Sequence, residues 1–253
     1  MRGVTCLAIS GGVGGAKLAL GLATYLEPPE LAIAANIGDD FEHLGLTICP
    51  DIDTLTYTLS GLSNEQTGWG RAGETATFMR ALEGLGGETW FHLGDGDLAL
   101  HVARSQRLRA GETLSGITAD ICQKLGIKAR ILPASDDAVR TIVQTTTGPL
   151  ALQHYFVRDQ CAPTVTGFHY EGADTARVNG EILEILSAPS LRAVIICPSN
   201  PYISIDPILA MPELKQALKE CPAPVIAVSP IVGGEALKGP TAKMMQELGA
   251  TVS

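Results

Sequence analysis

Short apolar runs alternate with segments of helical periodicity along most of the chain. The apolar runs are nearly continuous, without regular polar alternation, which is typical of parallel strands that are buried on both faces. Strands are therefore predicted at 4–10, 31–37, 89–93, 129–135, 191–197 and 224–229.

Helices are predicted where apolar residues recur every three or four positions. One follows the first strand at 18–26, and another begins near Asp53 or Thr54, because both residue types cap helices well. Further helices are predicted at 74–86, 95–111, 113–126, 180–189, 212–221 and 240–249.

One segment departs from this alternation. Residues 139–172 contain three β-rich runs, two of them joined at Gly148–Pro149, which predicts an antiparallel β insertion. The elements on either side predict an α/β fold with a doubly wound, mainly parallel, Rossmann-like sheet. Because no linker is long enough to divide the chain, we expect residues 1–253 to form a single α/β domain that contains this insertion.

Composition excludes several classes of protein. The chain is 45% hydrophobic and 18% charged, which excludes a disordered protein, and it has no apolar run long enough for a membrane helix. Its net charge of -9 argues against nonspecific binding to nucleic acid. The six cysteines are scattered without a CxxC pair, so neither zinc nor disulfides are expected. The N-terminal run leads straight into a glycine-rich loop and is too short for a signal peptide, so we expect a cytoplasmic protein.

Loops rich in Gly, Asp, Asn and Ser follow the predicted strands. In open α/β sheets, ligands bind beyond the carboxyl ends of the strands, so these loops are expected to meet at one edge and form a site. They lie at 10–17, 38–43, 94–97, 133–137, 198–207 and 229–234.

The first of these loops, "SGGVGGAK", is a candidate phosphate-binding segment. Backbone amides among glycines can approach an anion closely, and the N-terminus of the following helix favours negative charge. The loop matches neither a Walker A sequence nor a complete GxGxxG, and the alternative is a tight turn that packs the helix on the strand. Its candidate residues are Gly11, Gly12, Gly14, Gly15 and Lys17.

Four aspartates lie close together in "NIGDDFEHLGLTICPDIDT": Asp39, Asp40, Asp51 and Asp53. Acidic oxygen clusters suit Mg²⁺, which binds one or two carboxylates together with phosphate oxygens of a substrate. The alternatives are that Asp51 or Asp53 only caps a helix, or that all four carboxylates are solvated.

Further candidates lie on other loops. Ser199 and Asn200 in "PSNPYISIDP" suit phosphate or base recognition, or else form a rigid turn. His92 is a candidate contact for a phosphate or a ring system, although a lone histidine is more often structural. The segment "SPIVGGEALKGPTAK" resembles a second glycine-rich phosphate-binding loop, and it contains Lys238 and Lys243 as possible cations.

No catalytic triad is evident in the sequence, and His101 and His154 have no obvious partners. Acidic pairs combined with amide-rich loops favour metal-assisted phosphoryl chemistry instead.

Together these segments resemble the CofD family of 2-phospho-L-lactate transferases. The similarity begins at Thr5 and covers nearly the whole chain, with the family's order and spacing. The segments that carry it are "SGGVGGAKL", "NIGDDFEHLGLTICPDIDTLTYTLSG", "GWG" with "ET", "WFHLGDGDLALH", "LPASDD", "PSNPYISIDPIL" and "SPIVGGEALKGP".

The resemblance implies a Mg²⁺-dependent phosphotransferase of coenzyme F-420 biosynthesis. It would move a phospholactyl, phosphoenolpyruvyl or related phospho-acid group from a guanosine diphosphate conjugate to the deazaflavin FO, releasing GMP. By the family pattern, Asp53 contacts FO and His92 occupies the second FO-contacting position. Asp40, Asp51 and Asp53 are the candidate catalytic residues, and we choose Asp40 and Asp51 as the carboxylates linked to the metal. The glycine loop, Ser199 and Asn200 would hold the guanosine diphosphate. Small molecules are the expected partners, with no nucleic acid or membrane, and a homodimer is expected.

Two departures from the family pattern leave alternatives open. The family usually has GDRD where this chain has "GDGD", so a cation is missing at Gly96. Members of the family also usually continue beyond the position where this chain stops. The alternatives are a nucleotide-binding regulator of the gluconeogenesis-factor type and an inactive paralogue that acts as a subunit.

Overall fold

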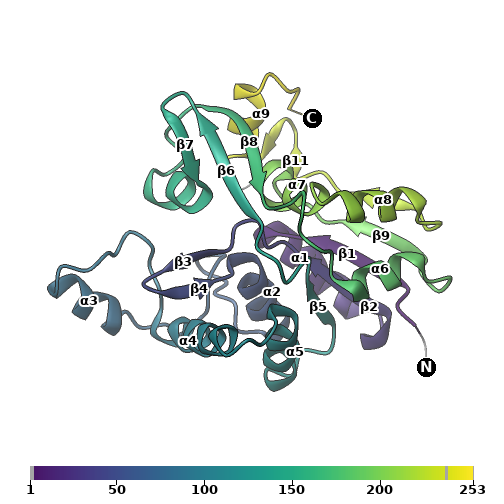
Figure 1. Cartoon of the computed structure of the whole chain (residues 1–253), viewed down its shortest axis with the longest axis horizontal. Coiled ribbons are helices and arrows are strands. Elements are labelled where there is room, and N and C mark those ends of the chain that lie inside the picture. Colours follow the sequence, from purple (N-terminus) through teal and green to yellow (C-terminus); the bar gives the residue numbers. More distant parts are fainter. Residues whose placement is uncertain (1–2, 237–238, 253) are drawn as a thin grey trace.

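A five-stranded parallel sheet forms the centre of the protein (Figure 1). The computed structural model describes residues 3–236 and 239–252. The strands have the order β10–β9–β1–β2–β5. Their bounds are Cys6–Ser10 (β1), Leu31–Ala35 (β2), Arg130–Pro133 (β5), Ala193–Ile196 (β9) and Val225–Ala227 (β10). Every residue of β1 and β2 is buried, so both faces of the sheet are covered at its centre, and the predicted parallel α/β fold is confirmed.

Helices flank the sheet. Helix α1 packs on α2, α5 packs on β5, and α6 packs on α8. The helices are Gly12–Tyr25 (α1), Pro50–Ser60 (α2), Thr77–Gly84 (α3), Asp95–Arg109 (α4), Leu114–Lys124 (α5), Gly180–Ser187 (α6), Asp206–Leu209 (α7), Pro212–Glu220 (α8) and Thr241–Glu247 (α9). Among the described residues, no helix combines the length and apolar character needed to cross a membrane.

Two helices begin earlier than predicted. Helix α1 starts at Gly12, so most of the predicted glycine loop is the first turn of this helix. Helix α2 starts at Pro50 with Cys49 as its N-cap, because proline suits the first helical position. Neither Asp51 nor Asp53 therefore caps α2, and both carboxylates are left for other contacts.

The predicted antiparallel insertion is confirmed. Strands β6 (Arg140–Thr145), β7 (Gly148–Ala151) and β8 (Val165–Glu171) form a sheet in the order β7–β6–β8. Buried Val143, Tyr155 and Val165 form a small core that also includes Ile203 and Met244 from later in the chain. The insertion is thereby packed against the segment that follows β9. The prediction of a single domain over 1–253 stays a prediction.

The predicted strand at 89–93 is wrong. These residues form an irregular segment because Trp90 and Phe91 pack edge-on against the aromatic rings of Phe41 and His43. Sequence periodicity also missed two short hairpins, β3 (Phe41–His43) with β4 (Leu46–Ile48), and β11 (Ile231–Val232) with β12 (Glu235–Ala236).

The strand order places a topological switch beside β1. From β1 the chain crosses to β2 on one side, and it returns later to β9 on the other side. A crevice forms at such a point beyond the carboxyl ends of the strands, where ligands of doubly wound folds bind. The segments after β1 and β9 therefore meet at this place.

Close packing at this switch point explains one of the glycines. A Cβ atom on Gly14 would lie 2.1 Å from the carbonyl oxygen of Pro198, whereas a Cβ on Gly21 in the same helix would meet nothing within 4 Å. We expect Gly14→Ala to lower the free energy of unfolding by about 1–3 kcal/mol, the usual range for overpacking. Gly21→Ala is the matched control, and it is expected to raise stability by about 0.5–1 kcal/mol. Equal stability of the two variants in urea denaturation would contradict this packing.

Candidate active site

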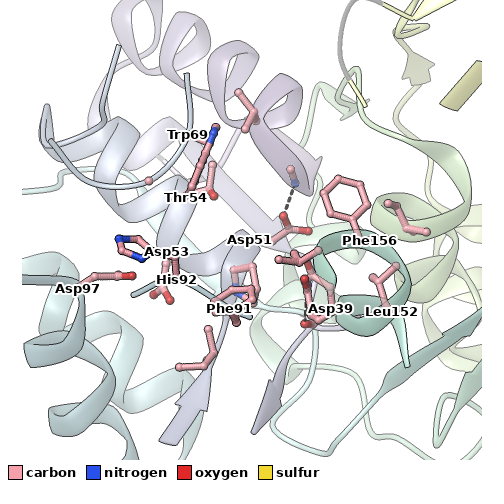
Figure 2. Close-up of a pocket in the computed structure, with 18 of the residues that line it drawn as sticks. Asp39, Asp51, Asp53, Thr54, Trp69, Phe91, His92, Asp97, Leu152 and Phe156 are labelled. Carbon is pink, nitrogen blue, oxygen red and sulfur yellow. Dashed lines mark hydrogen bonds between the residues drawn. The ribbon is translucent and has the colours of Figure 1, made fainter. Parts of the chain in front are cut away.

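A cavity of about 470 Å³ opens at the carboxyl edge of the sheet. Its wall is contributed by the first turns of α1 and α2, the segments 69–70 and 90–92, helix α4, and the π-helical turns His154–Arg158 and Pro201–Ile205 with their flanks. A volume of this size suits a small-molecule ligand. Figure 2 shows carboxylates and aromatic rings from these separate elements around one space.

Asp51 joins three of these elements. Its Oδ1 accepts a hydrogen bond of 2.5 Å from the backbone N–H of Gly12, and its Oδ2 accepts one of 2.9 Å from Asn36 Nδ2. Asn36 is fully buried, and the same amide donates to the carbonyl of Ile203 at 3.1 Å. Asp51 therefore places a carboxylate at the positive N-terminus of α1, which otherwise lacks a side-chain cap. Burial raises the pKa of Asp51 to about 6, although both donors favour its charged form.

Asp39 lines the cavity, whereas Asp40 does not. Oδ1 of Asp39, like Oδ1 of Asp40, is buried and has no hydrogen-bond partner among the described residues. Burial, followed by the charges of Asp51 and Asp40, raises the pKa of Asp39 well above its ordinary value. Asp40 is buried behind the wall, where Arg140 and the Cys49 thiol favour its charged form. The metal role assigned to Asp40 stays a prediction, and the geometry favours Asp39 in its place.

Asp53 points away from Asp51, because residues two positions apart on a helix do not face each other. Both carboxylate oxygens of Asp53 contact the guanidinium of Arg104 on α4, and the Nη1 contact measures 3.1 Å. Burial disfavours a charge on Arg104, but Asp53 and Cys49 raise the pKa of the guanidinium. The first turn of α2 thus sends one carboxylate toward α1 and another toward α4.

His101 lies between Asp53 and a third carboxylate, Asp97. Its Nε2 is 3.1 Å from Asp97 Oδ2, and its Nδ1 is 3.6 Å from Asp53 Oδ2. Ligand atoms of these three residues lie within 4.8 Å of one another, an arrangement that could hold a metal ion. The guanidinium of Arg104, 3.4 Å from His101 Nδ1, disfavours a cation at this position.

Aromatic side chains form much of the remaining wall. Trp69, Trp90, Phe91 and Phe156 line the cavity, and Trp69 remains 61% exposed. His92 lines the same space and is itself exposed. Aromatic faces of this kind suit the flat ring system of a ligand.

Most of the predicted phosphate-binding residues do not line the cavity. Gly12 lines the cavity, whereas Lys17 is exposed on α1 and does not. The hydroxyl of Ser199 donates to the carbonyl of Gly11, and the Asn200 side chain accepts from the N–H of Tyr202 at 3.0 Å. Cβ atoms on Gly11 and Gly15 would also clash with neighbouring side chains. These contacts support the packing alternative, and the nucleotide roles of Gly11, Gly14, Gly15, Ser199 and Asn200 stay predictions.

The second glycine-rich loop lies only partly within the described residues. Lys243 binds Glu247 at 2.7 Å and the hydroxyl of Tyr155 at 3.3 Å, so it has partners within the fold. Lys238 lies outside the described residues.

The space beside Gly96, where the family usually has an arginine side chain, is filled by Arg71. A Cβ at this position would lie 1.7 Å from Nη1 of Arg71, so the Arg71 guanidinium occupies the space of a side chain at residue 96. Glu74 holds this arrangement by bonding Arg71 at 3.2 Å and the N–H of Gly96 at 2.6 Å.

Sequence reasoning missed the aromatic residues of the wall and also four polar residues of the site: Asn36, Asp97, His101 and Arg104. Three of them have a signal that could have found them, because Asp97, His101 and Arg104 are spaced i, i+4 and i+7 and so share one face of a helix. Asn36 carries no such signal, since a single asparagine after a strand is common in turns.

The Arg104–Asp53 pair yields a stability prediction. Arg104→Met leaves the buried Asp53 carboxylate without its counter-charge, which typically costs about 3–5 kcal/mol of unfolding free energy. Arg109→Met is the matched control, because Arg109 is exposed near the end of the same helix and bonds the carbonyl of Gly45, and this change is expected to alter stability little. Adding Asp53→Asn to Arg104→Met should recover much of the loss in denaturant unfolding, and no recovery would contradict the pairing.

Asp40 yields a prediction about pH. Burial raises its pKa from 3.8 to about 7, so the folded protein holds this proton more tightly than the unfolded chain does. The contribution of Asp40 to stability is therefore complete below about pH 4, is lost as the pH rises to about 7, and stays constant above that. In a buffer with a chelator, Asp40→Asn should gain stability relative to wild type between pH 4 and pH 8. A pH-independent difference between the two proteins would contradict this.

Comparison with known proteins supports the resemblance in sequence. Residues 6–253 match the family described as 2-phospho-L-lactate transferase CofD. Phosphoenolpyruvate transferase from Kitasatospora aureofaciens is 40% identical over 249 residues, covering 96% of this chain and 77% of that protein. Its namesake from Mycolicibacterium smegmatis is 39% identical over 255 residues, covering 94% and 77%. 2-Phospho-L-lactate transferase from Methanococcoides burtonii is 38% identical over 244 residues, covering 96% and 78%.

A solved structure supports the fold. Protein BH3568 from Bacillus halodurans has a TM-score of 0.61 at 16% identity, covering 99% of this chain and 78% of that one. Identity at this level supports the fold alone. The family match over 6–253, with relatives at 38–40% identity, shows that the chain belongs to the CofD family of 2-phospho-L-lactate transferases.

Proposed function

We propose that this protein transfers a phospho-acid group from a guanosine diphosphate conjugate to the hydroxyl of the deazaflavin FO, releasing GMP. Relatives named for phosphoenolpyruvate and for 2-phospho-L-lactate both match the chain, so either acid is a candidate for the donor. The observation that carries the proposal is the first turn of α2. It directs Asp51 toward the N-terminus of α1 and Asp53 toward α4, within one cavity.

The side of the cavity near α1 fits the donor diphosphate and Mg²⁺. Asp39 offers a buried oxygen without a partner, and Asp51 offers a second carboxylate. One or two carboxylates together with substrate phosphate oxygens are what Mg²⁺ prefers in proteins. We therefore propose Asp39 and Asp51 as the residues that hold the metal, with Asp39 taking the place first assigned to Asp40. Bound there, Mg²⁺ would neutralise charge on the diphosphate and on the departing GMP.

The side near α4 fits the acceptor. Trp69, Trp90 and Phe91 offer ring faces for the deazaflavin, and His92 and Asp53 line the same space. We propose that the rings orient the acceptor so that its terminal hydroxyl approaches the donor phosphorus. The hydroxyl oxygen then bonds to phosphorus, the bond from phosphorus to the bridging diphosphate oxygen breaks, and GMP leaves with that oxygen.

The direct test is product formation. The protein, FO and a panel of guanosine diphosphate conjugates are incubated with Mg²⁺, and the products are analysed by mass spectrometry. We expect FO to gain one phospho-acid group in a reaction that a chelator stops. No modified FO from any donor would overturn the proposed activity.

The metal assignment is tested with neighbouring variants. Asp39→Asn should weaken Mn²⁺ binding in the presence of GDP by at least about tenfold, because it removes an oxygen ligand. Asp40→Asn should have the smaller effect, since Asp40 does not line the cavity. Calorimetric titration of Mn²⁺ measures both variants, and the reverse order of effects would restore Asp40 as the ligand.

The alternatives predict a different binding profile. A nucleotide-binding regulator or an inactive paralogue should leave FO unbound. A titration that follows deazaflavin fluorescence therefore separates both from the transferase.

A further inference from the structure

Asp97 is the most accessible of three polar side chains that meet beside the acceptor space. Its side chain is 21% exposed, compared with 7% for Asp53 and 2% for His101, and all three line the cavity. Asp97 lies in the first turn of α4, where the helix dipole favours a negative charge. Figure 2 shows its carboxylate directed toward the region of His92 and Asp53.

Two neighbouring side chains contact the Asp97 carboxylate and fix its orientation. The hydroxyl of Tyr57 donates to Oδ1, and Nε2 of His101 lies 3.1 Å from Oδ2. Burial disfavours the charge, but the contacts with His101 and Tyr57 lower the pKa of Asp97 below its ordinary value. Asp97 is therefore an oriented carboxylate that faces the cavity and stays ionised.

Asp53 is less free to act on a substrate. Both of its oxygens contact Arg104, and the same guanidinium also donates to the carbonyl of Thr47 at 3.4 Å. A carboxylate that accepts two contacts from a buried guanidinium is held as a charged partner. With both oxygens in contact with Arg104, Asp53 is less free than Asp97 to contact a substrate.

His101 connects the two carboxylates. Nη1 of Arg104 lies 3.4 Å from His101 Nδ1, and His101 Nε2 lies 3.1 Å from Asp97 Oδ2, so the imidazole ring bridges Arg104 and Asp97. The ring is almost completely buried, which fixes this orientation. Contacts thus connect Asp53, Arg104, His101, Asp97 and Tyr57, and Asp97 is the more exposed of the two carboxylates in this group that line the cavity.

We propose that Asp97 is the catalytic carboxylate that orients the acceptor hydroxyl and takes its proton, and that Tyr57 and His101 are its positioning residues. This rests on the proposed transferase function. As the acceptor oxygen bonds to the donor phosphorus, its O–H bond breaks and the proton passes to Asp97. The bond from phosphorus to the bridging diphosphate oxygen breaks, GMP leaves, and Asp97 returns the proton to solvent. A carboxylate that stays ionised suits this role, because the hydroxyl becomes acidic only as the new bond forms.

The test separates catalysis from acceptor binding. Asp97→Asn should lower kcat by about 10²–10⁴-fold, the range for loss of an acid–base group. FO affinity, followed by deazaflavin fluorescence, should stay within about threefold, because the amide keeps the size and polarity of the side chain. Asp95→Asn is the matched control. It lies in the same helical turn, does not line the cavity, and bonds the N–H groups of Thr77 and Phe78 instead.

The positioning role of Tyr57 is tested by a separate variant. Tyr57→Phe removes only the hydroxyl, so it should lower kcat by about tenfold without changing FO affinity, and it carries the test if Asp97→Asn fails to fold. If wild type forms no product, the proposed function and this inference both fall. If wild type is active and Asp97→Asn keeps kcat within threefold, Asp97 is not the proton acceptor. A loss of kcat that is specific to Asp53→Asn would assign that role to Asp53.

Discussion

The hydrogen bonds of Asp51 to Gly12 and Asn36 hold together the parts of the protein from which the cavity is built. They connect the start of α1, the segment after β2, the start of α2 and, through Asn36, the turn that follows β9. All these groups are buried or nearly so, where an unsatisfied donor or acceptor costs about 1–3 kcal/mol. The edge of the sheet is therefore fixed at the point where the strand order reverses.

The first turn of α2 then divides the cavity chemically. Asp51 faces the N-terminus of α1, together with Asp39, and Asp53 faces α4, where Arg104 balances its charge. A two-residue spacing on a helix produces this divergence. A phosphoryl transfer needs charge neutralisation at the donor and orientation of the acceptor hydroxyl. In our proposal Asp51 serves the first need, and Asp53 and its neighbours on α4 serve the second.

The sequence predicted the parallel sheet, most helices and the antiparallel insertion, because continuous apolar runs and helical periodicity are local signals. It also identified Asp51, Asp53 and His92, all of which line the cavity. It ranked Asp40 above Asp39, because periodicity does not say which of two adjacent side chains faces a cavity in a turn. It missed Asn36 and the charges on α4, since their partners are distant in sequence: Arg104 meets Asp53 across 51 positions.

The division of the cavity is tested most directly by diffraction at the manganese absorption edge from crystals grown with Mn²⁺ and a guanosine diphosphate conjugate. We expect the anomalous signal next to Asp39 and Asp51, with the diphosphate at the N-terminus of α1. A signal between Asp53, Asp97 and His101 would contradict the account, because it would place the metal where we place the acceptor hydroxyl.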